Sequence, residues 1–226
     1  MRFLFTNIYG LLRTLRPKQW IKNIFVFAAL VFDQKLLNWP LLAKTIAAFV
    51  LFCMISSTVY IINDLADLEK DKQHPKKCRR ALPSGQLKPW FAVLSVIGIL
   101  GVSLPLSFWL HGYFGAIVLA YFLLNLAYSF VLKHMVIIDL MVVASGFVLR
   151  VAAGVVVAEA VRFSPWLYVC TIFLALFMVI GRRRHELILL ASGANSHRKI
   201  LEEYTVDYLD QMSHLVATGA IISYSL

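Results

Sequence analysis

The stretch TIAAFVLFCMISSTVYII (residues 45–62) contains no charged side chain and is followed at once by NDLADLEKD (residues 63–71). An α-helix rises 1.5 Å per residue, so about 20 apolar residues cross a hydrocarbon core of about 30 Å. The apolar stretch covers most of that distance and ends where a dense group of carboxylates begins. We therefore predict a transmembrane helix that delivers acidic side chains to one membrane surface.

Similar apolar runs recur along the chain and predict an all-α, polytopic transmembrane helix bundle with six full spans. The runs are residues 21–32, 45–62, 90–109, 113–132, 140–158 (interrupted by Arg150) and 163–180. The first run is short, but Trp20 and Trp39 bracket it at about spanning distance, as in an interfacial aromatic belt. A re-entrant or interfacial first segment is the alternative.

A seventh apolar run begins near Leu215, and the sequence ends at Leu226 after about half a bilayer of helix. We therefore expect residues 1–226 to form a single transmembrane domain that is incomplete at its C-terminal end. The three cysteines, Cys53, Cys78 and Cys170, show neither metal-ligand nor redox spacing and are not expected to take part in chemistry.

The composition, 60% apolar and 15% charged with a net charge of +10, excludes an ordinary soluble domain. Most basic residues fall on one side of the predicted bundle: Arg2, Arg13, Arg16, Lys18, Lys22, Lys70, Lys72, Lys76, Lys77, Arg79, Arg80, Lys88, Lys133, Arg182, Arg183, Arg184, Arg198 and Lys199. The opposite loops hold only Lys35, Lys44 and Arg162. The positive-inside rule therefore places the N terminus and the basic loops in the cytoplasm, and no nucleic acid partner is needed to explain the charge. The first twenty residues lack a signal-peptide pattern and are expected to form an amphipathic arm on the inner leaflet.

Four oxygen-bearing side chains after the second run share one face if the helix continues through residue 71. They are Asn63, Asp64, Asp67 and Asp71. Like charges stacked on a helix destabilise it by a few tenths of a kcal/mol (about 0.2–0.5) per pair in water, unless a cation is present. Carboxylates suit Mg²⁺, which completes its octahedron with waters and substrate phosphates. We predict that these residues bind Mg²⁺; the alternative is a solvated helix end whose acids pair with Lys70, Lys72 and the basic run that follows.

A basic run follows this acidic segment and precedes the turn sequence Pro83, Ser84, Gly85. The run contains Lys76, Lys77, Arg79 and Arg80. It is interpreted either as an anchor on an anionic lipid surface or as a phosphate clamp.

Polar and charged side chains also occur at the ends and inside the fourth and fifth spans. They are Tyr128, Lys133, Asp139 and Arg150. An arginine near mid-bilayer costs several kcal/mol unless it faces a protein or aqueous interior, so Arg150 is a functional candidate. The alternative is an ion pair that holds helices together. Gly146 and Gly154 on the same helix are expected to allow close helix packing.

The sixth span ends in the sequence GRRRHEL (residues 181–187). Its arginines either bind phosphate or satisfy the membrane topology and the helix dipole. Glu186 beside them is either their salt-bridge partner or a further carboxylate on the metal side. Tyr204 and Tyr208, one turn apart before the last apolar run, are expected to be interfacial anchors.

The motif Asn63-Asp64-x-x-Asp67-x-x-x-Asp71 after a second membrane helix resembles the first aspartate motif of the UbiA superfamily of intramembrane prenyltransferases. Further motifs resemble, more specifically, the decaprenyl-phosphate phosphoribosyltransferase branch. They are residues 16–23 (RPKQWIKN), His74-Pro75 after Asp71, Tyr128-Ser129-x-x-Leu132-Lys133, Asp139, Gly146-Phe147-x-Leu149-Arg150, and residues 181–187. The resemblance covers almost the whole chain.

This resemblance implies a nine-helix bundle in a bacterial cell membrane, with a polar cavity open to the cytoplasm. It implies Mg²⁺-dependent transfer of the 5-phosphoribosyl group from phosphoribosyl pyrophosphate to a polyprenyl phosphate. The implied metal ligands are Asn63, Asp64, Asp67 and Asp71, and the implied catalytic residues are Asp64, Asp67, Lys133 and Arg150. The implied substrate-binding residues are Lys22, Asn63, Lys77, Arg79, Tyr128, Asp139, Arg182, Arg183 and Glu186.

The chain departs from many aromatic prenyltransferases of the superfamily, because it offers Glu186 and arginines in place of a second DxxxD-type motif. The departure favours the phosphoribosyl branch. An aromatic prenyltransferase with a polyprenyl pyrophosphate donor is the first alternative. A transporter or scaffold is the second, although matching halves with broken helices are not evident. The sequence makes no prediction of oligomeric state.

Overall fold

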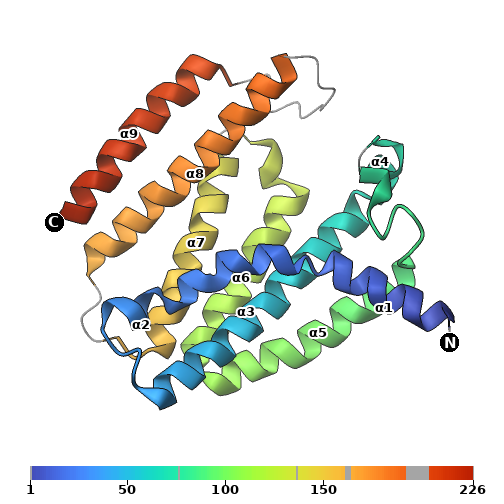
Figure 1. Cartoon of the computed structure of the whole chain (residues 1–226), viewed down its shortest axis with the longest axis horizontal. Helices are drawn as coiled ribbons and strands as arrows, with labels where there is room; N and C mark the ends of the chain where they lie inside the picture. Colours follow the sequence, from blue (N-terminus) through green and yellow to red (C-terminus); the bar gives the residue numbers. More distant parts are fainter. Residues whose placement is uncertain (1, 76, 136, 161–163, 192–203, 226) are drawn as a thin grey trace.

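The computed structural model describes residues 2–75, 77–135, 137–160, 164–191 and 204–225, and the regular structure in these residues is helical (Figure 1). The α-helices are α1 (Arg2–Thr14), α2 (Ala28–Phe32), α3 (Trp39–Ala66), α4 (Leu68–Gln73), α5 (Pro89–Leu110), α6 (Gly112–Phe130), α7 (Ile138–Val157), α8 (Pro165–Ala191) and α9 (Val206–Ser225). Three 3₁₀ segments join them: η1 (Pro17–Phe27), η2 (Lys77–Arg79) and η3 (Leu132–His134). The all-α prediction is confirmed.

Five of the described helices are long and apolar enough to cross a membrane: α3, α5, α6, α7 and α8. They correspond to the second to sixth predicted spans, because each predicted run forms the apolar body of one helix. α8 continues well beyond its run to Ala191, since the arginines and Glu186 that follow the apolar part are themselves good helix formers.

The first predicted span, residues 21–32, does not form one continuous α-helix. It is divided between η1 and the short helix α2, and it is not among the five described helices that meet the spanning criteria. Pro17 begins η1, and Arg16 before it adopts a left-handed conformation (φ 53°, ψ 61°). Figure 1 shows this segment running across the bundle, where it packs on α3 and α7. The prediction of six full spans is therefore not confirmed at its first member.

α9 begins at Val206, before the predicted start near Leu215. Asp207 and Asp210 lie in its first turns, so its polar beginning lowers its hydropathy. Figure 1 shows α9 beside α8. The two helices share a buried cluster with α7 that includes Leu140, Ile180 and Leu209.

α1 is amphipathic, as predicted for the N-terminal arm. Its exposed apolar face consists of Phe5, Ile8, Tyr9 and Leu12, spaced three or four residues apart. Its opposite face is buried, and Asn7 Oδ1 accepts a hydrogen bond of 3.0 Å from the backbone N–H of Lys88. The arm is thus fixed to the loop before α5 and presents its apolar face outward.

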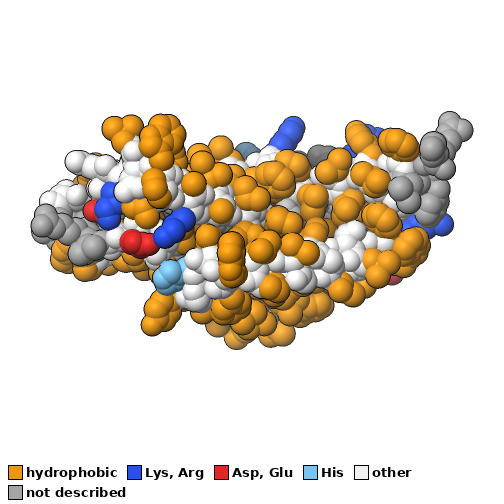
Figure 2. Space-filling view, turned by 90° about the horizontal axis from the view of Figure 1, so that it is seen from below, with side chains coloured by type: hydrophobic (Ala, Val, Ile, Leu, Met, Phe, Trp, Pro, Cys, Tyr) orange, Lys and Arg blue, Asp and Glu red, His pale blue; other side chains and the backbone are white. Residues whose placement is uncertain are grey.

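Hydrophobic side chains cover most of the face seen in Figure 2, and the charged side chains gather mainly towards its two ends. Large exposed apolar residues such as Trp90, Trp109 and Leu123 contribute to the outer surface of the spans. A water-soluble protein rarely exposes so much apolar area, whereas a lipid-embedded bundle requires it.

Gly154 of α7 lies directly against η1, and a Cβ at this position would be 2.0 Å from the carbonyl oxygen of Val26. We predict that Gly154→Ala lowers the free energy of unfolding by about 1–3 kcal/mol through overpacking. Gly98→Ala in α5 is the matched control, since its Cβ would meet no atom within 4 Å. The check is the thermal midpoint of both variants in detergent; an equal midpoint for the two would contradict the close packing of η1 on α7.

Candidate functional site

The acidic segment begins in the last turn of α3 and continues into α4. The condition for the shared face, a helix that continues through Asp71, is not met, because α3 ends at Ala66 and Asp67 (φ −96°, ψ 10°) separates it from α4. The backbone nevertheless keeps its helical rise, since Asp67 N–H donates to Asn63 O at 3.0 Å and Asp71 N–H donates to Asp67 O at 2.8 Å. The break changes the local direction without separating the acids.

Asp64 and Asp71 are both buried and are brought together by one arginine. Nη1 of Arg80 lies 3.1 Å from Asp64 Oδ1 and 2.6 Å from Asp71 Oδ2. Nη2 of Arg16 approaches Asp64 Oδ1 at 2.6 Å. Two carboxylates that share one nitrogen of a guanidinium are close enough to share a cation.

The other acids of the segment are also paired with basic residues. Lys133 Nζ is 3.4 Å from Asp67 Oδ1, and Lys77 Nζ is 3.7 Å from Asp71 Oδ1. Asn63 is half-buried beside Asp64. The alternative, in which the acids of the segment pair with Lys70, Lys72 and the following basic run, is borne out in part: Asp71 pairs with Lys77 and Arg80 of that run, and Glu69 on the outer side of the segment pairs with Lys72. Asp64 and Asp71 are buried, so the segment is not a solvated helix end.

The basic run after α4 contributes to the site through Lys77, which was expected, and through Arg80, which was not. Arg79 is exposed, whereas Arg80 turns inward to the carboxylates. Lys76 lies outside the described residues. Arg16 and Arg80 were present in the quoted motifs but were not chosen as site residues, because linear spacing does not show which member of a basic run turns toward the acids.

Arg150 lies in the interior of the bundle and is buried. Its Nε donates to Asn23 Oδ1 at 2.8 Å, its Nη1 to the carbonyl of Gly146 at 2.6 Å, and its Nη2 to the hydroxyl of Tyr121 at 2.8 Å. The guanidinium carbon also lies near three ring centroids: that of Tyr121 at 4.8 Å, that of Phe147 at 5.4 Å and that of Phe52 at 5.5 Å. The alternative of an acidic partner for Arg150 is therefore not what the described residues show.

Lys22 in η1 adds a second cation near Arg150. It lies outside the five spanning helices, and its pKa is lowered by burial first and then by the nearby charges of Arg182, Arg150 and Arg16. The Arg182 side chain is largely exposed and makes a long contact of 3.4 Å with Glu186. The interior beside Lys22 is therefore electropositive.

Asp139 and Arg183 form a buried ion pair between α7 and α8. Arg183 donates to Asp139 Oδ2 from Nε at 3.1 Å and from Nη2 at 2.7 Å, and to Glu186 Oε2 from Nη1 at 2.8 Å. Glu186 is thus a salt-bridge partner of the arginines. The charges of Asp139, Arg183 and Glu186 are thus paired with one another. Tyr128 lies half-buried at the end of α6.

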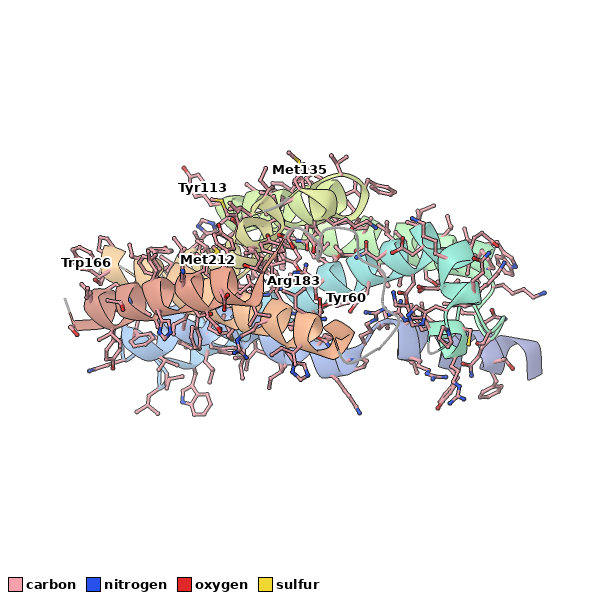
Figure 3. The ribbon with its side chains drawn as sticks, turned by 90° about the horizontal axis from the view of Figure 1, so that it is seen from above. Tyr60, Tyr113, Met135, Trp166, Arg183 and Met212 are labelled. Carbon is pink, nitrogen blue, oxygen red and sulfur yellow. The ribbon has the colours of Figure 1, made fainter. Side chains whose placement is uncertain are left out.

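Tyr204 is buried, so its prediction as an interfacial anchor is wrong. Its hydroxyl donates to Asp139 Oδ1 at 3.0 Å and accepts from the N–H of Ile137 at 2.8 Å. Tyr208 stacks on Tyr204 with ring centroids 6.4 Å apart and is 40% exposed. Figure 3 shows Arg183 and Tyr60 in the inner part of the bundle, with Trp166 and Tyr113 farther out.

An open apolar hollow of about 570 Å³ lies along η1 and α2. Its lining includes Ile24, Phe25, Phe27, Val31 and Phe32. It has almost no polar lining, so the chemistry-bearing side chains lie elsewhere. Within the described ranges, no three His, Cys, Asp or Glu side chains are grouped closely enough to hold a metal ion by themselves.

Comparisons of the sequence and of the fold with known proteins both find similarity to UbiA proteins. The model of the UbiA prenyltransferase family matches residues 23–185. Decaprenyl-phosphate phosphoribosyltransferase of Mycolicibacterium smegmatis is 38% identical, over 97% of this chain and 70% of that protein. The protein of the same name from Corynebacterium glutamicum is 36% identical, over 96% of this chain and 66% of its own length. The chain thus spans about two thirds of the length of these relatives.

The fold is similar to a solved UbiA homologue from Archaeoglobus fulgidus bound to GPP and Mg²⁺. That structure has a TM-score of 0.75 and 18% identity, over 96% of this chain and 76% of the other. The same protein bound to DMAPP and Mg²⁺ gives a TM-score of 0.73. At this identity the likeness shows the fold.

We predict that substitution of Asp139 lowers the stability of the fold more than it lowers the affinity for substrate. Replacing Asp139 by Ala leaves the Arg183 guanidinium, whose side chain is 6% exposed, without its main counter-ion. Loss of one partner of a buried pair costs about 3–5 kcal/mol, so the thermal midpoint should fall by many degrees. Glu186→Gln is the matched control: its side chain is 31% exposed, and a cost of about 1 kcal/mol or less is expected. A stable Asp139→Ala protein with weakened substrate binding would contradict this assignment.

Proposed function

Because the chain belongs to the UbiA prenyltransferase family, we propose that it is a Mg²⁺-dependent membrane transferase that moves the 5-phosphoribosyl group of phosphoribosyl pyrophosphate to a polyprenyl phosphate such as decaprenyl phosphate. The support from relatives is that two proteins named decaprenyl-phosphate phosphoribosyltransferase are 36–38% identical to it over nearly the whole chain. Membership of a transferase family also answers the transporter or scaffold alternative.

The observation that carries the proposal is the presence of two different centres for anions. The first consists of Asp64, Asp67 and Asp71, which would bind an anion through Mg²⁺, and of the arginines and lysines paired with them. The second is the electropositive interior at Lys22 and Arg150, neither of which has an acidic partner among the described residues. A reaction between a pyrophosphate and a separate phosphate needs two such centres, since both reactants are anionic.

The carboxylates fit Mg²⁺ by a direct observation: a single nitrogen of Arg80 already contacts both Asp64 and Asp71. Mg²⁺ usually takes only one or two protein carboxylates and completes its shell with water and substrate phosphates, so a cluster of three acids is not required. We propose that Asp64 and Asp71 hold the ion, with Asp67 and Asn63 beside them. When bound, Mg²⁺ would neutralise charge on the departing pyrophosphate.

The chain's own cations are assigned to phosphate oxygens. Arg16, Arg80, Lys77 and Lys133 surround the carboxylates and would donate to the pyrophosphate once the acids are shared with Mg²⁺. Arg79 is exposed and has no part in this assignment.

Lys22 and Arg182, with the nearby charge of Arg150, are proposed to bind the second phosphate. Asp139, Arg183 and Glu186 are assigned to the support of this side of the site, because their charges are already paired with one another.

The group transfer balances without a protein base. The bond between the anomeric carbon of the ribose and the pyrophosphate oxygen breaks, and pyrophosphate leaves with the electron pair. An oxygen of the lipid phosphate, already ionised at neutral pH, supplies the pair for the new bond. The donors around the leaving group stabilise the charge that develops on it, which is the main electrostatic requirement of the step.

We also propose that the acidic segment faces the cytoplasm in a bacterial cell membrane. The charge asymmetry supports this orientation, because the loops on the side of the acidic segment carry most of the Lys and Arg residues. Phosphoribosyl pyrophosphate is then reached from the aqueous side, and the lipid phosphate from the bilayer.

The direct test is transfer of label from phosphoribosyl pyrophosphate to decaprenyl phosphate by the purified protein in lipid nanodiscs. An acid-labile lipid product that forms with Mg²⁺ and is abolished by EDTA is the expected result. Asp64→Asn and Asp67→Asn should lower kcat/KM by about 10²–10³-fold, as loss of a key electrostatic group does. Glu69→Gln is the matched control, since Glu69 points outward to Lys72. Transfer of a prenyl group from a polyprenyl pyrophosphate to an aromatic acid, with no phosphoribosyl transfer, would replace this proposal by the aromatic prenyltransferase.

A second prediction concerns the cation that now stands between the acids. Arg80→Gln removes the positive charge that bridges Asp64 and Asp71, so the carboxylates should bind Mn²⁺ more tightly in the absence of any phosphate, by about tenfold for a change of about 1.4 kcal/mol. Electron paramagnetic resonance of free and bound Mn²⁺ measures the change. Arg79→Gln is the control with the same change of charge on an exposed neighbour. Equal effects of the two variants would show a general charge effect and contradict a specific site.

A further inference from the structure

Ile137, immediately before α7, has an unfavourable backbone conformation. Its φ is 66° and its ψ is −46°, a combination with positive φ that lies outside the left-handed helical region and near the rare classic γ-turn, and that a β-branched residue rarely adopts. Such a conformation persists only where the surroundings hold it. Its N–H donates to Tyr204 Oη at 2.8 Å, and its carbonyl accepts from the N–H of Met141 at 3.0 Å. Ile137 is therefore held from both sides.

Tyr204 holds this residue from a distant part of the chain, on the N-terminal side of α9. Its hydroxyl uses its proton for Asp139 Oδ1 and a lone pair for the Ile137 N–H. Burial raises the pKa of Tyr204 to about 12, so the hydroxyl remains a donor at neutral pH. The opposite oxygen of Asp139 accepts both hydrogen bonds from Arg183, so Tyr204 completes the set of donors around a fully buried carboxylate.

Lys133 stands only four residues before Ile137, in η3. Its side chain is 21% exposed and its Nζ is 3.4 Å from Asp67 Oδ1. The position of this lysine depends on the two helices that flank and contact η3, which are α6 and α7. α7 begins immediately after the residue that Tyr204 holds. Packing of the Lys133 side chain itself contributes little to fixing its position, because a partly exposed lysine keeps much of its rotamer freedom.

We propose that Tyr204 is a positioning residue that holds the start of α7 and thereby places Lys133 against the acidic segment. The affinity of the site for a phosphate ligand is thus set in part by the chain that precedes α9. The inference rests on the proposed function for the identity of that ligand, a Mg²⁺-pyrophosphate group. Neither the family motifs quoted above nor the spacing of Tyr204 and Tyr208 assigns this role.

The test uses Tyr204→Phe, with Tyr208→Phe as the matched control. Both variants lose one hydroxyl, one turn apart, but Tyr208 is 40% exposed and only stacks on Tyr204. Amide hydrogen exchange of the ligand-free protein in nanodiscs should become faster at residues 137–141 in Tyr204→Phe and remain unchanged in Tyr208→Phe. Unchanged exchange in both variants would overturn the anchoring role without reference to any ligand.

The second readout is the affinity for inorganic pyrophosphate in the presence of Mg²⁺, measured by calorimetry. Tyr204→Phe should weaken it by about tenfold, and it should cause no further loss when Lys133 is already Gln, because residues that act as a unit are not additive. An independent, multiplicative loss in the Lys133→Gln background would overturn the positioning role. Wild-type protein that binds no pyrophosphate would instead overturn the proposed function.

Ile137→Gly keeps the test decisive if Tyr204→Phe folds poorly. Glycine adopts a positive φ without strain, so the combined variant Ile137→Gly/Tyr204→Phe should recover stability and part of the affinity. Recovery of stability with no recovery of affinity would show that Tyr204 acts on folding alone and would overturn its positioning role.

Discussion

The structure depends on one constraint: a charge buried in a lipid-embedded bundle must be compensated within the protein. Asp64 and Asp71 meet this requirement through Arg16 and Arg80, and Asp139 meets it through Arg183. Arg16 with Asp64 and Arg183 with Asp139 join segments 48 and 44 residues apart, so compensation of charge also defines how the helices meet. The acidic end of α3 is fixed to the loop after α4, and α7 is fixed to α8. The polar centre is thus part of the fold as well as the place where chemistry is proposed.

Arg150 satisfies the same constraint in a different way. Its donors are used by an amide oxygen, a hydroxyl and a backbone carbonyl, and aromatic rings surround the guanidinium. These groups solvate the charge without cancelling it, because dipoles and quadrupoles carry no net charge. The interior therefore keeps a net positive potential that also reaches Lys22. A carboxylate partner would have removed the attraction for an anion, so the choice of neutral partners favours a site over a structural staple.

The sequence alone predicts the features that depend on contiguous residues, which are the apolar runs and the short motifs. The five spanning helices follow from apolar runs, and the family follows from short motifs around Asp64, Lys133 and Arg150. Properties that depend on tertiary contacts were missed. The spacing of Tyr204 and Tyr208 could not distinguish a buried residue from an exposed one, and the inward turn of Arg80 depends on the path of a loop. The prediction of the first span was not confirmed for a related reason: the apolar run is short, and its packing on α3 and α7 decides its conformation.

Exposure separates the ion pairs into two kinds. The Arg80 and Arg16 side chains are 36% and 31% exposed, whereas that of Arg183 is 6% exposed. A partly hydrated arginine can turn from a carboxylate to a phosphate with little change in its own solvation, provided that another cation takes its place at the buried acid. A buried arginine cannot leave without its own charge becoming uncompensated in a low-dielectric interior. The first kind suits a site where cations and anions exchange during each turnover. The second kind suits a fixed structural role. The two kinds lie close together in the sequence: Lys133, between α6 and α7, contacts Asp67 of the acidic segment, and Asp139 in the first turn of α7 pairs with Arg183.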